Sequence, residues 1–200
     1  MKNNNRIHLA LILIISLIFS SYNGNAQEKQ HKQAINVCAI AIPVMNFYVL
    51  NYEYLHKDRH GLALRVEYAP KMEGAHTNGI AWAGVINYRW HICSKLEGVF
   101  VGPYARYRYV YGEGSAIETN YDFKVPEFNL GLNTGYRWIS KIGINVVISA
   151  GYGYSWSFEE LSPESDIVLD EFNKFKKAND ANTAILDAPF YGELSIGYAF

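Results

Sequence analysis

The chain ends in an alternating stretch, Phe190-Tyr-Gly-Glu-Leu-Ser-Ile-Gly-Tyr-Ala-Phe200. Counted back from Phe200 to Leu194, every second residue is apolar or aromatic, and the residues between them are small or polar. A period of two indicates a β-strand with one apolar and one polar face. Because chain ends usually fray unless they are tied into a sheet, we expect this strand to belong to a larger β-structure.

The same alternation recurs along the chain and predicts eight strands, most of them near the roughly 9–11 residues of a tilted membrane strand. Short connections alternate with longer ones after the second strand, which is typical of an antiparallel up-and-down barrel. The expected strands are 34–42, 47–56, 62–71, 80–91, 98–111, 127–139, 144–158 and 190–200. The expected longer connections are 73–79, 112–126 and 159–188.

The first 26 residues have the pattern of a cleaved signal peptide. Lys2 and Arg6 precede an apolar run from Leu9 to Phe19, and small residues come before Gln27. The run is shorter than the roughly 20 apolar residues that a membrane-spanning helix needs, which disfavours an anchor. We therefore expect a signal peptide at 1–26, a short periplasmic segment at 27–33 and a barrel at 34–200.

The composition fits a membrane barrel better than an ordinary globular domain. Aromatic residues make up 15% of the chain and charged residues 18%, and there are 16 Tyr and 16 Gly. No second long apolar run follows the first, and a membrane protein without spanning helices must be a closed barrel. The net charge of −1 gives no reason to expect a nucleic-acid partner.

Alternation does not by itself say which face points outward, and a secreted lipid-binding barrel would keep its apolar face inside. The vertical distribution of side chains favours the membrane barrel, because aromatic residues stand at both strand ends and aliphatic residues fill the middle. Both ends of the barrel sequence are then periplasmic. The expected periplasmic aromatic girdle is Tyr52, Tyr54, Tyr88, Trp90, Tyr136, Trp138, Tyr198 and Phe200.

The polar faces of the strands carry charges of both signs, and these face the lumen of such a barrel. Eight strands enclose a space that side chains just fill, so we expect an ion-pair network that closes it. A narrow channel for small ions is the alternative. The charged residues are Glu53, Arg65, Glu67, Arg89, Arg106, Arg108, Glu127, Arg137 and Glu193.

Four segments resemble a small outer-membrane barrel family of unknown function that is common in Bacteroidota. They are Val101–Tyr104, Gly135–Trp138, Ala150–Gly153 and Gly192–Phe200. The resemblance implies an outer-membrane location in a Gram-negative envelope and brings no catalytic residue and no cofactor. The last segment also resembles the assembly signal that barrel-insertion machinery recognises, carried here by Leu194, Ile196, Tyr198 and Phe200.

Some eight-stranded outer-membrane barrels are lipid A-modifying enzymes, so an enzyme is a competing hypothesis. One type uses Ser and His with a carboxylate near the outer leaflet. Here His76 lies in an outer connection, and the nearest serines are Ser115 and Ser162. The remaining candidates, His56, His60 and His91, map to the periplasmic rim as interface residues.

No metal-ligand spacing is present, and we expect no metal site. Cys38 and Cys93 do not form a paired motif. The periplasm permits a disulfide, so their pairing is left open.

The connection 159–188 is the best candidate for a contact surface. It holds eight acidic residues and three lysines. Ile167–Lys177 suits a short amphipathic helix, with Ile167, Glu171 and Lys174 at helical spacings. The segment is either a solvated loop or a surface for an envelope or extracellular partner or a lipopolysaccharide sugar. We expect a structural or interaction role for the whole protein.

Overall fold

The computed structural model describes residues 31–38, 46–73, 76–116, 119–163, 165–183 and 190–200. The expected signal peptide lies outside the described residues, as does most of the first connection. The elements are β1 (Gln33–Val37), β2 (Tyr48–His56), β3 (His60–Glu73), β4 (Thr77–His91), β5 (Gly98–Ala116), β6 (Thr119–Ile139), β7 (Ile144–Ser157), β8 (Glu160–Ser162), α3 (Asp166–Thr183) and β9 (Phe190–Ala199).

Eight strands close into an antiparallel barrel within the described residues. The hydrogen-bonded order is β5-β4-β3-β2-β1-β9-β7-β6, and pairing of β5 with β6 closes the ring. Strands that follow one another along the chain are neighbours, apart from the short β8 and helix α3 that precede β9. The predicted all-β, eight-stranded, up-and-down barrel is confirmed.

The barrel has two ends, which we name by their connections. The turn end carries 57–59, 92–97 and 140–143, and the loop end carries the longer connections. At the turn end Gly143 adopts a φ of 91°, and a Cβ there would lie 2.7 Å from the carbonyl oxygen of Ala199. Glycine alone fits this tight turn beside β9 without strain.

Side chains alternate between the two faces of the barrel. In β2 every second residue from Val49 to Leu55 is buried, and those between are exposed. The exposed positions are apolar or aromatic, as in Tyr52 and Tyr54, whereas buried positions include Asn51 and Glu53. The barrel therefore has an apolar outer surface and a charged interior.

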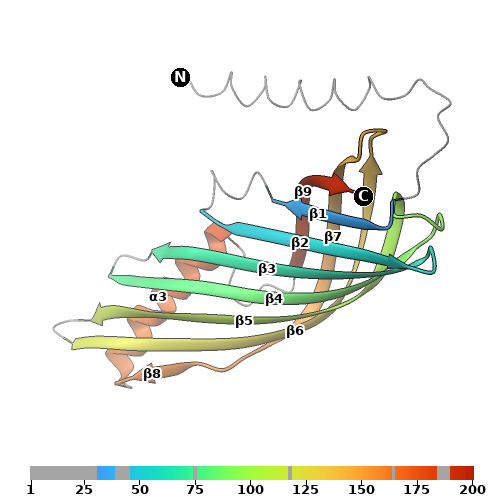
Figure 1. Ribbon diagram of the computed structural model, residues 1–200. Coiled ribbons are helices and arrows are strands. Elements are labelled where there is room, and N and C mark those ends of the chain that lie inside the picture. The colour runs from blue at the N-terminus through green and yellow to red at the C-terminus, as the bar shows by residue number, and fades with distance from the viewer. Residues whose placement is uncertain (1–30, 39–45, 74–75, 117–118, 164, 184–189) are drawn as a thin grey trace.

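Four strands continue beyond the barrel at the loop end (Figure 1). The predicted loop 112–126 is wrong, because β5 runs on to Ala116 and β6 begins at Thr119. The register is continuous from Gly98↔Arg137 to Ala116↔Thr119. We name residues 69–73, 77–81, 110–116 and 119–125, with β8 at their edge, the extension.

Helix α3 lies against the inner face of the extension, behind β3–β6 in Figure 1. Its buried residues Val168, Phe172 and Phe175 have the i, i+4, i+7 spacing of one helix face. They form a hydrophobic cluster with residues of the four strands: Ala69, Met72, Ala81, Val110, Ala116, Tyr121, Phe123 and Val125.

The free edge of the extension is protected against pairing with another strand. Pairing of β2 with β3 ends at Tyr48↔Tyr68, so residues 69–73 have no strand on that side within the described residues. A register shift between Ala69 and Met72 and the presence of Pro70 distort this edge. Bulges and prolines are common devices against edge-to-edge association.

Candidate functional site

An ion-pair cluster centred on Glu53 occupies the turn-end half of the lumen. Arg89 Nη1 and Arg137 Nη2 both donate to Glu53 Oε2 at 2.6 Å, and His91 Nε2 lies 2.7 Å from Oε1. Arg89 Nη2 also donates to Glu193 Oε2 at 2.7 Å. Arg89 thus joins two carboxylates on strands distant in sequence, and all five side chains are buried.

Neutral side chains complete the shell of Glu193. Asn51 Nδ2 donates to Oε1 at 3.1 Å, and Ser195 Oγ donates to the same oxygen at 2.6 Å. A buried charge must be paired or hydrogen-bonded to be tolerated, and Glu193 is both.

A second ion-pair cluster lies in the loop-end half. Arg65 Nε is 2.6 Å from Glu67 Oε1, and Arg108 donates a short hydrogen bond to Glu127 Oε2. Arg106 Nη2 is 3.9 Å from Glu127 Oε1. Three arginines therefore share two carboxylates in this half of the lumen.

A pair of stacked tyrosines lies beside the second cluster. The rings of Tyr104 and Tyr191 have centroids 4.7 Å apart, and both are buried with Val85. The Arg65 guanidinium lies 4.8 Å from the centre of the Tyr191 ring, a cation–π geometry. Tyr191 therefore contacts a charge of the second cluster. Arg65 Nη1 also donates to the carbonyl of Gly192 at 3.0 Å, next to Glu193 of the first cluster.

Apolar side chains pack at both ends of the described barrel. At the turn end Leu55 and Leu96 pack with Ala34 and Ala199, and all four are at most 1% exposed. At the loop end α3 and its cluster cover the four strands of the extension. The described interior thus holds two ionic clusters and a tyrosine pair, with apolar side chains packed at each end.

The structure brings together all the charged residues predicted for the lumen. They come from six strands and meet because each sits on the inward face at matching heights. His91 corrects the prediction of a rim residue, since it is 0% exposed and contacts Glu53. The signal was present in the sequence: His91 continues the inward series Asn87, Arg89.

The aromatic residues predicted for the girdle project outward at the turn end. All are exposed except Trp138, which is half-buried. A second outward aromatic row stands at the loop end, where Trp82 contacts the rings of Tyr107 and Tyr109 at 5.9 Å. The other members of this row are Tyr48, Tyr68, Phe128, Tyr152, Tyr154, Trp156 and Phe190.

The candidate assembly-signal residues Leu194, Ile196, Tyr198 and Phe200 all face outward. Phe200 also connects the last strand to the first. Its N–H donates to the carbonyl of Gln33 at 2.8 Å, and the N–H of Gln33 donates to its carbonyl at 2.9 Å. These four side chains extend the apolar surface of β9.

The His and Ser residues of the enzyme hypothesis and the two cysteines lie at separate places in the structure. The backbone N–H of Ser115 donates to the carbonyl of His76 at 3.0 Å, which sets these two residues side by side at the loop end. Ser162 lies on β8 opposite Asp122. Cys38 and Cys93 are free thiols, which decides the question that their spacing left open.

The amphipathic helix that the spacing suggested is present as α3, and the structure shows which of its faces packs. Ile167 and Lys174 are exposed and Glu171 is half-buried, whereas Val168, Phe172 and Phe175 are buried. Lys174 Nζ contacts Asp170 at 2.9 Å and Glu171 at 3.4 Å. The hydrogen bond to Asp170 and both negative charges raise the pKa of Lys174 above its ordinary value.

A family described as protein of unknown function (DUF3575) matches residues 9–177, which is most of the chain. The chain belongs to this family. The predicted membership of a small barrel family of unknown function is confirmed. No curated protein matches the chain. None of the helical residues that the structure describes forms a segment long and apolar enough to span a membrane.

Proposed function

We propose that this family member is an integral outer-membrane barrel with a closed lumen, which serves the cell envelope as a scaffold or contact protein and not as an enzyme. The observation that carries the proposal is the polarity of the barrel wall. Outward residues such as Leu132 and Ile148 are 64% and 59% exposed, whereas Glu53 and Arg89 inside are 1% exposed. A secreted lipid-binding barrel would need the reverse arrangement.

The spacing of the aromatic rows supports the membrane location. Trp82 and Trp90 on β4 are eight residues apart, which at a tilt near 40° separates them by about 20 Å along the barrel axis. Phe128 and Trp138 on β6 are ten residues apart, which gives about 25 Å. Both values agree with the apolar band of outer-membrane barrels, about 25 Å tall.

The closed lumen supports a scaffold over a channel. An ion crossing the barrel would have to pass the buried ion pairs, the stacked Tyr104 and Tyr191, and the apolar layer at the turn end. Opening such a path would separate buried ion pairs, which costs several kcal/mol for each charge left alone.

The loop end supplies the surface for contacts in this proposal. Short turns of outer-membrane barrels face the periplasm, so the extension and α3 face outward from the cell. The exposed face of α3 carries Asp170 and Lys174 with Ile167 and Leu169, which are 53% and 42% exposed. An envelope or extracellular partner, or lipopolysaccharide, meets this end first, and assembly uses the barrel-insertion machinery.

Fractionation of cells that make the protein tests the location. The protein is expected in the outer-membrane fraction, with faster gel migration before heating than after, as a folded barrel shows. Recovery in the soluble periplasmic fraction would overturn the proposal. Mass spectrometry of lipid A from a deletion strain tests the enzyme alternative, which an altered acyl pattern would revive.

A further inference from the structure

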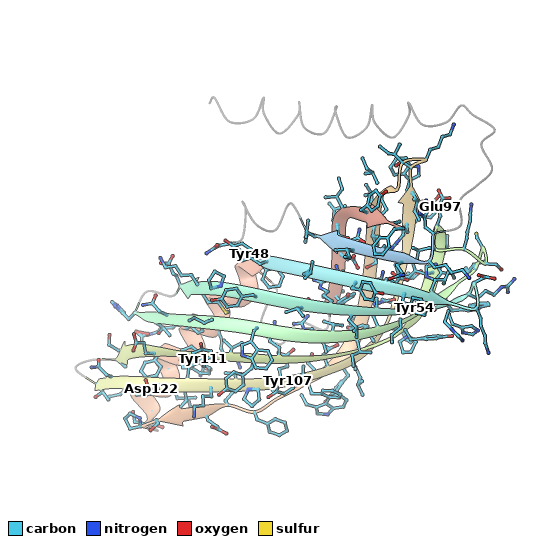
Figure 2. All side chains as sticks on the ribbon, in the orientation of Figure 1. Tyr48, Tyr54, Glu97, Tyr107, Tyr111 and Asp122 are labelled. Carbon is cyan, nitrogen blue, oxygen red and sulfur yellow. The ribbon has the colours of Figure 1, made fainter. Side chains whose placement is uncertain are left out.

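The outer face of the extension carries a groove of about 740 Å³, on the side of the sheet opposite α3. This volume is in the range of small-molecule sites. Figure 2 labels Tyr111 and Asp122 in this region and Tyr107 in the aromatic row nearby. Its lining includes the outward residues Asn78, Ile80, Tyr111, Glu113, Asp122 and Lys124.

The lining forms two parallel rows of outward side chains. Ile80, Tyr111 and Lys124 are register partners in the row nearer the barrel. Asn78, Glu113 and Asp122 form the next row. The groove therefore offers one exposed aromatic ring with hydrogen-bond donors and acceptors on both sides of it.

The floor of the groove is packed from beneath. It is backbone at the register pair Gly79↔Gly112, where a Cβ would lie 3.1 Å and 2.8 Å from the Phe123 ring. Phe123 in turn packs against Phe172 and Phe175 of α3, with both centroid distances 5.1 Å. The buried helix thus supports the sheet directly beneath the groove.

The charges of the groove disfavour an ionic ligand. Lys71 is paired with Glu73, and two lysines stand against three carboxylates, which disfavours a phosphate. In the described part of the chain no three acidic, His or Cys side chains are grouped so as to hold a metal ion. Carboxylates, an amide and ammonium groups around an exposed ring suit a ligand with many hydroxyl groups and apolar ring faces, which is a saccharide.

The height of the groove points to a saccharide attached to the membrane. Its first row lies two residues, or about 7 Å along the strand, beyond the aromatic row of Trp82 and Tyr109. Ring contacts connect the two levels, since Tyr109 lies 5.9 Å from Trp82 and 5.8 Å from Tyr111. If that aromatic row marks the membrane interface, the groove stands at the level of the sugars of outer-leaflet glycolipids.

We propose that this groove binds the core saccharide of a lipopolysaccharide in the surrounding outer leaflet. The inference rests on the proposed membrane location and names the site and the part of the glycolipid that is recognised. Tyr111 provides the surface for a sugar ring, and Asp122 and Asn78 bind its hydroxyl groups.

Native mass spectrometry of the detergent-solubilised protein tests this assignment with three probes. They are a rough lipopolysaccharide that carries inner-core sugars, lipid A without those sugars, and the released core oligosaccharide. We expect one molecule of the rough lipopolysaccharide per barrel, at least about tenfold tighter binding of it than of lipid A, and its displacement by the oligosaccharide. Equal binding of lipid A would overturn the proposal, because acyl chains on the apolar belt would then account for the affinity.

Point variants test whether the lipopolysaccharide binds in the groove. Tyr111→Ala and Asp122→Asn should each weaken binding about tenfold. Tyr48→Ala is the matched control, because Tyr48 is a loop-end outward tyrosine of similar exposure, 44% against 41%, whose ring contacts Tyr68 and lies outside the groove lining. Unchanged affinity in Tyr111→Ala, or equal loss in Tyr48→Ala, would contradict the site.

Heat-modifiable migration shows whether each variant is folded, independently of sugar binding. If the barrel inserts into membranes but does not bind the core sugars, this inference is wrong and the proposed function is unaffected. A chain recovered outside the membrane defeats the proposed function, whatever it binds.

Discussion

The ring of Phe123 in β6 and the ring of Phe175 in α3 lie with their centroids 5.1 Å apart, inside the sheet that extends beyond the barrel. Helix α3 belongs to the connection between β7 and β9. This contact holds it against β3–β6, which come much earlier in the chain. The segment expected to be a solvated loop or a contact surface is thus also part of a hydrophobic core.

Replacing Phe172 and Phe175 together by Ala should release α3 and leave the barrel folded. Each truncation removes about 3–5 kcal/mol of packing when the site cannot collapse, and that packing fixes α3 and not the barrel wall. Limited proteolysis should cut within 166–177 far faster than in the unchanged protein, while the heat-modifiable shift remains. The control is Ile167→Ala with Leu169→Ala, since both side chains are exposed. Equal protease resistance of the Phe variant would contradict the docking.

Glu53→Gln should destabilise the barrel strongly. Arg89 and Arg137 would lose the carboxylate that both contact at 2.6 Å, and a buried charge without its partner costs about 3–5 kcal/mol. The urea midpoint of the barrel in detergent should fall. Glu73→Gln is the matched control, because its pair with Lys71 is exposed and contributes at most about 1 kcal/mol. Similar midpoints for the two variants would show that the lumen network does not hold the barrel together.

Strand alternation predicted the barrel and its inward charges, because a period of two fixes the face of every residue once one is placed. It missed the extension, where residues 112–126 were predicted to be a loop. Tyr121, Phe123 and Val125 keep the inward alternation there. Their apolar side chains are buried only because α3 packs against them. The spacing suggested the helix but not its buried face, since the partner sheet decides which side is buried. The groove depends on a bulge and a register that no local pattern reveals.

The protein should show no steady conductance in planar bilayers. The lumen is filled by ionic and aromatic layers and closed by Leu55 and Leu96 at the turn end. We expect the same result after Phe172→Ala with Phe175→Ala, because the turn-end layer does not depend on α3. A reproducible open channel in the unchanged protein would show that the lumen network moves aside.

Both cysteines should react with an alkylating reagent in the absence of reductant. The denatured protein should gain two adducts by mass spectrometry, since both thiols are free. In the folded protein Cys93 should react first, because it is exposed, whereas the half-buried Cys38 contacts the carbonyl of Leu194 at 3.1 Å. A mass without adducts would reveal a disulfide and require a different arrangement of β1.

The most direct test of the membrane assignment uses the four tryptophans, Trp82, Trp90, Trp138 and Trp156, which all stand on the outer surface in the two aromatic rows. The measurement is quenching of their fluorescence by lipids brominated at different depths of the acyl chain, after reconstitution into bilayers. A variant with Trp82→Phe and Trp156→Phe reports the turn-end row, and one with Trp90→Phe and Trp138→Phe reports the loop-end row. We predict that both rows are quenched, more strongly by bromines near the headgroups than by bromines at the bilayer centre. Fluorescence that no brominated lipid quenches would place the apolar surface outside the membrane and contradict the account.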